Sequence, residues 1–319
     1  MSASAVSAAE RGVYQPRDAN GKDIRLQDFC VFKQGRYTYI CSMKKDLCNQ
    51  GMIVARSTDL AKWETLGDAV TTRTAEDKSM VWAPHVVEDR GTFYMFYTGV
   101  TTPKPGRWCQ RILVAATKDP SKPAAWQRSY DARFVVDGKE QSWFRPSHAG
   151  SVWTDSDWAD CRDPMVLRHD KTWYLFYSGT DTDGGIAGVA TAPSVLGPWT
   201  DRGAVMKVAP GTVPESCFVL KASDGTFVMT FNHAGPAREG TKTARAKSLI
   251  PVDGKPSFSD IRLIKDTTGP ELTGWAHEFI PLGRGDLLCA NLTGYFVSLK
   301  HAKLRKEAWG WTVVEGAGG

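Results

Sequence analysis

The clearest structural signal in this chain is Asp163-Pro-Met-Val-Leu-Arg-His-Asp-Lys-Thr-Trp-Tyr-Leu-Phe-Tyr177. It consists of an apolar run, a short polar turn at 169–171, and a second run of aromatic and β-branched residues. This order is typical of a β-hairpin, in which two apolar strands flank a tight turn. The same pattern recurs four more times, in copies that begin at Asp28, Pro84, Glu215 and His277.

A strand-rich unit repeated every 50 to 80 residues or so predicts a β-propeller. A second apolar pair follows each hairpin, and in four of the five copies it closes on a tryptophan. These tryptophans are Trp63, Trp126, Trp199 and Trp311. Because they recur from blade to blade, we interpret them as packing between blades. The sequence therefore predicts an all-β, five-bladed propeller with four antiparallel strands per blade.

The propeller is expected to be a single catalytic domain over residues 23–319, preceded by a flexible extension over residues 1–22. One connection, residues 131–160, is much longer than the others and contains Trp143, Trp153 and Trp158. Long connections in compact domains are usually functional. We expect this insert to wall the pocket, together with the shorter loops 44–50, 101–109, 180–185, 233–241 and 292–295.

Composition excludes several classes of function. The net charge is +5, and the Lys and Arg residues are scattered, so nothing indicates nucleic-acid binding. No apolar run is long enough to span a bilayer. The N-terminus lacks a secretory signal pattern, which favours a cytoplasmic protein, with secretion after signal removal as the alternative. Seven cysteines without a CxxC pair are expected to be buried thiols, and no cofactor is required.

Three of the five hairpins begin with a carboxylate, namely Asp28, Asp163 and Glu215. Equivalent positions in different blades converge on the propeller axis, so these side chains are predicted to meet in one pocket. Like charges held together repel one another, and such an arrangement needs a use. Cleavage of a glycosidic bond is one use, because it needs a carboxylic acid to protonate the leaving oxygen and a carboxylate to activate water or attack carbon.

Four further residues lie at or beside the predicted starts of inner strands: Trp82, His85, Trp275 and His277. A tryptophan there could stack on a sugar ring, and a histidine could bind its hydroxyls. Glu278 follows His277, and strict strand alternation would turn it away from the channel. We therefore leave Glu278 out of the predicted site.

With these motifs in view, the chain resembles the five-bladed propeller glycoside hydrolases of families 43 and 32, from about Asp23 to Val314. Trp82-Ala-Pro is similar to a family 43 motif in blade two. Arg162-Asp163-Pro164 resembles the Arg-Asp-Pro of family 32, and its Asp-Pro is shared with family 43. Glu215 stands where both families have their acid.

The resemblance implies Asp28 as base or nucleophile, Asp163 as the orienting and pKa-setting carboxylate, and Glu215 as general acid. It also implies that Arg162 binds sugar hydroxyls. His277 matches a channel histidine of family 43, which holds a water or a metal ion. A channel metal near His277 is thus an expectation of the resemblance, whereas no metal site follows from the residues themselves.

The expected function is hydrolysis of a terminal or side-chain glycosidic bond of a small or oligosaccharide substrate. Arabinofuranosides, fructofuranosides and xylosides all remain open, as do retention and inversion of the anomeric centre. The alternatives are glycosyl transfer, elimination or isomerisation on the same scaffold, and a carbohydrate-binding propeller without catalysis.

Overall fold

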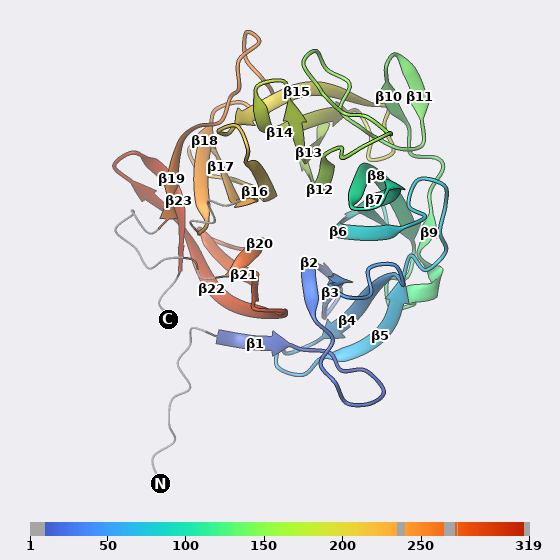
Figure 1. Ribbon diagram of the computed structural model, residues 1–319. Helices are drawn as coiled ribbons and strands as arrows, with labels where there is room; N and C mark the ends of the chain where they lie inside the picture. Colours follow the sequence, from blue (N-terminus) through green and yellow to red (C-terminus); the bar gives the residue numbers. More distant parts are fainter. Residues whose placement is uncertain (1–9, 235–239, 265–271, 273, 316–319) are drawn as a thin grey trace.

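The computed structural model describes residues 10–234, 240–264, 272 and 274–315 of the chain. Five small sheets stand around a central axis, which confirms the predicted five-bladed propeller (Figure 1). Strands within a blade pair antiparallel in sequence order, because each is joined to the next by a short connection. One 3-10 turn, Pro123–Ala125, is the only helical element that lies wholly within the described residues.

Blade one consists of β2 (Leu26–Gln34), β3 (Tyr37–Lys44), β4 (Met52–Ser57) and β5 (Glu64–Ala69). Blade two consists of β6 (Met80–Asp89), β7 (Thr92–Lys104), β8 (Arg107–Thr117) and β9 (Gln127–Arg128). Blade three contains β12 (Cys161–His169), β13 (Thr172–Asp181), β14 (Gly184–Ala192) and β15 (Trp199–Lys207). Blade four consists of β16 (Val213–Lys221), β17 (Phe227–Ala234), β18 (Lys242–Ala246) and β19 (Ser259–Leu263). Blade five contains β20 (Trp275–Gly283), β21 (Asp286–Thr293), β22 (Phe296–Glu307) and β23 (Gly310–Glu315).

The first strand of each blade lies nearest the axis, as Figure 1 shows for β2, β6, β12, β16 and β20. Each inner strand is joined to its neighbour by one of the predicted tight turns. Residues of positive φ, such as Gly35, Arg90 and Gly285, allow these turns. The starts of the inner strands therefore lie together at the other end of the channel, and this places the candidate site.

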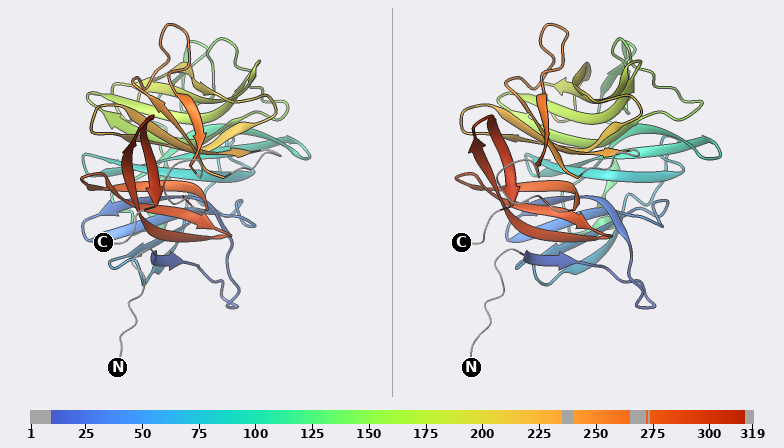
Figure 2. Two further views of the ribbon diagram at one scale, coloured as in Figure 1. Left: turned by 90° about the vertical axis from the view of Figure 1, so that its left-hand side faces the viewer. Right: turned by 60° about the vertical axis from the view of Figure 1, so that its left-hand side comes forward.

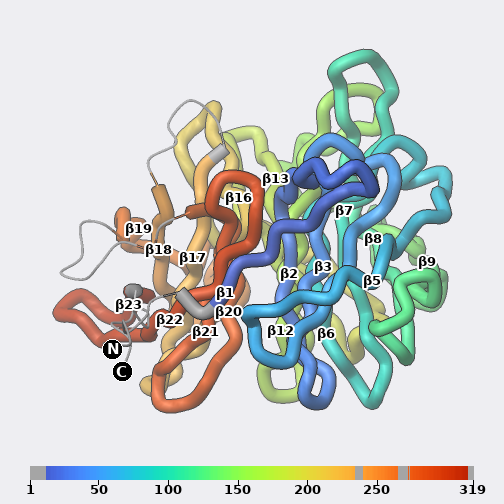
Figure 3. Tube along the Cα trace, turned by 90° about the horizontal axis from the view of Figure 1, so that it is seen from below, coloured from blue at the N-terminus to red at the C-terminus, as the bar shows by residue number. Residues whose placement is uncertain are grey.

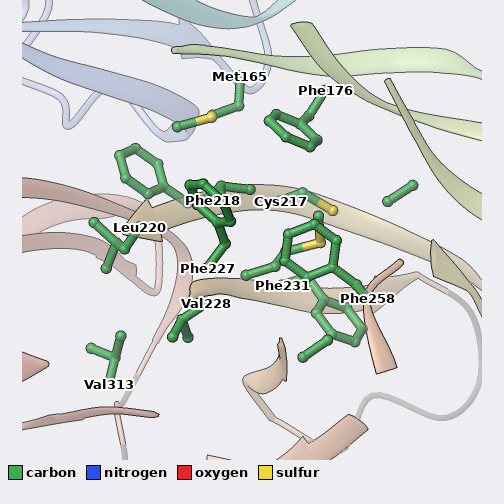
Figure 4. Packing of buried hydrophobic residues seen from close by; sticks show 14 of the residues in the cluster. Met165, Phe176, Cys217, Phe218, Leu220, Phe227, Val228, Phe231, Phe258 and Val313 are labelled. Carbon is green, nitrogen blue, oxygen red and sulfur yellow. The ribbon is translucent and has the colours of Figure 1, made fainter. Parts of the chain in front are cut away.

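Apolar side chains fill the spaces between neighbouring sheets. One cluster joins blades three, four and five, where Phe176, Phe231 and Phe258 are buried from solvent (Figure 4). Trp199 is fully buried and packs against Phe96 of blade two, in line with the expected packing between blades. The seven cysteines form no disulfide, and six of them are buried.

Blade five is completed by the opposite end of the chain. Strand β1 (Glu10–Tyr14) pairs antiparallel with β22, and it lies between blades five and one (Figure 3). Residues 1–22 are predicted to form an extension outside the propeller. Residues 10–14 instead close the ring, because β22 presents a free edge once β23 turns away from it; residues 1–9 lie outside the described part.

Strand β23 pairs with the far half of β22 and packs against β17 and β18 of blade four. Figure 2 shows this terminal hairpin from the side, in dark red. Blade five thus has five strands rather than four, since β1 and β23 share the edge of β22.

The long insert mostly lies away from the axis. Its strands β10 (Phe134–Val136) and β11 (Lys139–Gln141) extend blade three, because β10 pairs with the outer strand β15. The expectation that the insert as a whole walls the pocket is therefore wrong for this part. Only its last residues return to the channel mouth. No helix in the described residues has the length and apolar character needed to cross a membrane.

Candidate functional site

All five inner strands contain the same irregularity near their start. One residue in each has φ between 42° and 53°, and the pairing register with the next strand shifts around it. These residues are Asp28, Ala83, Asp163, Ser216 and Ala276. A positive φ is unfavourable for residues with a Cβ, and such strain is found mainly at functional sites. The feature is a β-bulge repeated in every blade.

The three carboxylates were predicted to occupy equivalent positions in their blades, and the position of the bulge shows that they do not. Asp28 and Asp163 occupy the bulge position itself, whereas Glu215 lies one residue earlier, before Ser216. The position of Glu215 is matched in other blades by Trp82, Arg162 and Trp275. An inserted residue resets strand alternation, so two successive residues of one strand can face the channel mouth. Arg162 and Asp163 both do so.

The structure brings the three carboxylates together. Asp28, Asp163 and Glu215 line one cavity of about 490 Å³ at the start of the inner strands. A second cavity of about 320 Å³ adjoins it, and Asp28 and Glu215 line both. Both volumes lie in the range of small-molecule sites. The carboxyls of Asp28 and Glu215 therefore stand between two hollows.

Aromatic side chains line each hollow. In the larger one, Trp108 packs against Trp82 at 5.4 Å and against Trp158 at 5.3 Å between ring centroids. In the smaller one, Trp275 and Tyr295 face the cavity. Trp82 and Trp275 were predicted site residues. Trp108 lies at the start of β8, within the loop 101–109 that was expected to line the pocket, but it was not named as a site residue because it lies outside the inner strands.

Arg162 is buried and links several acidic groups. Its Nη2 donates to Glu215 Oε1 at 3.2 Å, and its Nη1 pairs with Asp160 and donates to Gln110 Oε1 at 3.3 Å. Burial works against the charge, but Asp160, Asp163 and Glu215 together raise the pKa of the guanidinium. Arg162 thus remains a fixed cation inside a cluster of carboxylates.

Two of the carboxyls in the cavity resist ionisation. Burial raises the pKa of Asp163 to about 6, against the attraction of Arg162 and a hydrogen bond of 2.9 Å from the Ser216 N–H. Burial also raises the pKa of Asp28 well above its usual range, and the charges of Asp163 and Glu215 add to this effect. Groups with such shifts cluster at catalytic sites, because proton transfer near neutral pH needs them.

His85 does not reach the carboxylate cavities. It lies deeper in the channel, where its Nε2 donates to the Val166 carbonyl at 3.1 Å and its Nδ1 lies 3.5 Å from Glu278 Oε1. Burial raises the pKa of Glu278, against the effect of His85. The exclusion of Glu278 from the channel was wrong, because Glu278 lines a small space between the two ends of the channel together with Asp28 and Asp163. The bulge at Ala276 reversed the alternation on which that exclusion depended.

His277 lies beside blade four and not in the cavities. It is buried, lies 3.4 Å from Thr241 Oγ1 through its Nδ1, and stacks on Phe279. Among the described residues, no group of three or more His, Cys, Asp or Glu side chains is arranged to hold a metal ion. The channel metal near His277 stays a prediction of the resemblance.

The loops expected to wall the pocket contribute unevenly. Lys45 lines both hollows, and Gly294 and Tyr295 line the smaller one. Residues 235–239 of the predicted loop 233–241 lie outside the described part of the chain. Of the long insert, Trp158 reaches the larger cavity.

Comparison with known proteins identifies the group to which these features correspond. Residues 23–148 match the model of the glycosyl hydrolases family 43. This segment contains blades one and two, with Asp28 and Trp82. No curated protein sequence matches the chain.

Several solved structures share the fold at low identity. A thermostable family-43 glycoside hydrolase is 17% identical, with a TM-score of 0.60 over 92% of this chain and 94% of its own. An exo-beta-1,3-galactanase from Phanerochaete chrysosporium, solved with beta-1,3-galactotriose, is 16% identical, with a TM-score of 0.63 over 97% of this chain and 67% of its own. A GH32 beta-fructofuranosidase from Bombyx mori is 14% identical, with a TM-score of 0.64 over 92% of this chain and 64% of its own.

The resemblance to propeller glycoside hydrolases inferred from the sequence is confirmed by these matches. The solved structures establish the fold. The family match over residues 23–148 supports the enzyme class, which is glycoside hydrolase.

Proposed function

We propose that this propeller glycoside hydrolase cleaves a terminal or side-chain bond of a furanoside or xyloside by acid–base catalysis between carboxyl groups. The observation that carries the proposal is the convergence of Asp28, Asp163 and Glu215 on one aromatic-lined cavity. A carbohydrate-binding protein without catalysis would have no use for three crowded carboxyls, two of which have a raised pKa.

The surroundings of each carboxyl support a division of roles. Glu215 is the proposed proton donor, since it is half-buried beside both hollows and can reach an oxygen that bridges them. Asp28 is the proposed base or nucleophile, since it lines the same two hollows; because its pKa is raised, this role requires a pH at which Asp28 is ionised. Asp163 is buried and tied to the Ser216 N–H, which suits a group that orients the sugar rather than one that reacts.

The two hollows support a substrate with a sugar on each side of the scissile bond. A sugar in the larger hollow would lie against Trp82 and Trp108, and its neighbour in the smaller hollow would lie against Trp275. Aromatic faces pack well on the apolar faces of sugar rings. The bond between the two sugars would then pass beside Asp28 and Glu215.

The choice of sugar needs a panel of substrates. It should contain aryl arabinofuranosides, fructofuranosides and xylosides, and also beta-1,3-galactosides, because an exo-beta-1,3-galactanase shares the fold. Proton NMR of the first product released would show whether the anomeric configuration is retained or inverted.

The roles are tested with two substrates that differ only in the leaving group. Protonation of the leaving oxygen contributes roughly 10²–10⁴ in rate when departure is difficult and little when it is easy. Glu215→Ala should therefore lose most activity on a natural glycoside but retain much of it on a dinitrophenyl glycoside. Asp28→Ala should lose activity on both, because attack at carbon is required whichever group departs. The reverse pattern would exchange the two roles, and an inactive wild-type protein on the whole panel would refute the proposed function.

A further inference from the structure

We propose that Asp160, the last residue of the long insert, is a positioning residue that holds both the aromatic wall of the larger cavity and the arginine that contacts the proposed acid. The inference rests on the proposed function of the same site and extends it to a residue that does not itself face the substrate.

Three side chains donate to Asp160, whose own side chain is only 9% exposed. Trp158 Nε1 donates to Oδ1 at 2.9 Å, and Thr180 Oγ1 donates to Oδ2 at 2.6 Å. Arg162 Nη1 forms an ion pair with Oδ1. The carboxylate thus joins the insert, strand β13 and the start of β12. Hydrogen bonds to a charged, buried acceptor are stronger than neutral ones, so this junction is rigid.

One branch of the junction leads to the wall of the cavity. Trp158 is 40% exposed and packs on Trp108, which packs on Trp82. Packing on Trp108 fixes this partly exposed indole only on one side, so its hydrogen bond to Asp160 sets its orientation. Loss of that bond would free the outermost ring of the wall.

The other branch leads to the proposed acid. The guanidinium of Arg162 is planar, so the partner of Nη1 sets where Nη2 points. Asp160 and Gln110 hold Nη1, and Nη2 then faces Glu215 Oε1 at 3.2 Å. The negative charge of Asp160 also partly neutralises Arg162, which weakens the attraction of Arg162 for the catalytic carboxylates.

The charge of Asp160 has a second effect on the cavity. It is one of the neighbours that raise the pKa of Asp163, in addition to burial and Glu215. When this charge is removed, the positive charge of Arg162 is less neutralised. The ionised forms of the carboxyls in the cavity are then more stable. We therefore expect the whole pH profile of activity to move toward lower pH in Asp160→Asn, which keeps the size of the side chain.

The experiment compares kcat, KM and the pH profile of wild type, Asp160→Asn and Asp160→Glu on one substrate from the panel. Asp160→Asn should shift both limbs of the profile toward lower pH by up to about one pH unit, since Asp160 is the smallest of the contributions that raise the pKa of Asp163. Its KM should rise several-fold through the freed Trp158. Asp160→Glu keeps the charge and should restore the pH profile more than the KM.

Asp157→Asn is the matched control, because Asp157 lies in the same insert, is 48% exposed, and pairs with Arg107 rather than Arg162. It should leave both limbs unchanged. Equal profiles for wild type and a folded Asp160→Asn would overturn the inference while the proposed function stands. A crystal structure of Asp160→Asn with Trp158 and Arg162 in their original positions would overturn it even if no substrate is found.

Discussion

Blade three contributes to two clusters of polar and charged side chains, and the clusters differ in how well their charges are satisfied. The carboxylate cluster at the axis consists of Asp28, Asp163, Glu215 and Arg162. The histidine cluster consists of His148, Tyr177, Asp181 and Asp201, and it fastens the long insert to strands β13 and β15.

In the histidine cluster nearly every polar atom has a partner. His148 Nδ1 and Nε2 each lie 2.8 Å from a carboxylate, of Asp201 and Asp181 respectively. Burial opposes the charge, but these two carboxylates raise the pKa of His148 to about 8. Burial alone would raise the pKa of Asp201, yet the bonds from His148 and from backbone N–H groups lower it overall.

In the carboxylate cluster the negative charges outnumber their partners. Arg162 is the only cation buried there among the described residues, and Asp163 receives one backbone hydrogen bond through Ser216. The pKa values of Asp28 and Asp163 are raised rather than lowered. Similar residues under similar burial thus stabilise the fold in one place and strain it in the other. The strained cluster is the one that lines the cavities, as expected where function competes with stability.

The largest effect is expected when the histidine cluster is broken. Asp201→Ala removes the acceptor for His148, Tyr177 and three backbone N–H groups. The protonated His148 then loses one of its two carboxylate partners. Removal of one partner of a buried pair costs about 3–5 kcal/mol of unfolding free energy. Urea unfolding measures this loss. Asp183→Ala is the control, since Asp183 is 73% exposed in the same region, and a loss equal to the control would show that the histidine cluster contributes nothing.

An effect of opposite sign is expected in the carboxylate cluster. The pKa of Asp163 is raised from 3.8 to about 6, so its contribution to stability is present below about pH 4 and is lost as the pH rises through 6. Asp163→Asn keeps an acceptor for the Ser216 N–H and removes the charge. It should raise the unfolding free energy at pH 7.5 by up to about 3 kcal/mol, at about 1.4 kcal/mol per pKa unit, while activity falls.

The same variant should unfold like wild type at pH 4, where Asp163 is already protonated. Urea midpoints at the two pH values make the comparison. A variant less stable than wild type at pH 7.5 would mean that the ionised Asp163 is satisfied in the folded protein, and the contrast between the clusters would disappear.

A smaller effect is expected from the titration of His148. Its pKa is raised from 6.5 to about 8, so the stability it contributes is full below pH 6.5 and is lost as the pH rises through 8. The shift corresponds to about 2 kcal/mol, and to about 1 kcal/mol after allowance for solvent screening of a partly exposed ring. The stability difference between wild type and His148→Gln should narrow by this amount from pH 6 to pH 9. A difference that is constant with pH would show that His148 does not titrate with the fold.

The smallest effect is expected for a charged pair on the surface. Arg17 and Asp23 form an ion pair with side chains that are 69% and 57% exposed. Water screens such a pair and its side chains lose entropy when they associate, so the two contributions nearly cancel. Asp23→Asn should leave the urea midpoint of unfolding unchanged within error. A clear shift would mean that burial is not what separates the two buried clusters from ordinary ion pairs.

Much of the architecture was accessible from the sequence because it depends on local chemistry. Apolar runs of strand length, turns rich in Gly and Asp, and a fixed repeat were enough to predict five blades and to order their strands. The convergence of Asp28, Asp163 and Glu215 also followed, because the start of every inner strand must face the axis. Trp82 and Trp275 were found for the same reason, whereas Arg162 was implied by the resemblance of Arg162-Asp163-Pro164 to a family motif.

The errors about side chains on the inner strands have one cause in common, which is that strand alternation was assumed to be unbroken. The bulge residues are Asp in two blades, Ala in two and Ser in one, so no residue type marks them in the sequence. Because each bulge resets the alternation, Glu278 faces the channel and His277 packs beside Thr241. His85 was placed beside the carboxyls and instead lies deeper in the channel.

The sequence by itself determined the repeat, the strands and the residues that begin each inner strand, since these depend on neighbours only a few positions apart. The tertiary structure decided which partner each strand edge meets and where each strand bulges. Strand β1 closes the ring on β22, almost 290 residues along the chain, and Asp201 holds His148 from another strand. Such contacts depend on how segments far apart in the chain pack together, and a local pattern of residues does not predict that packing.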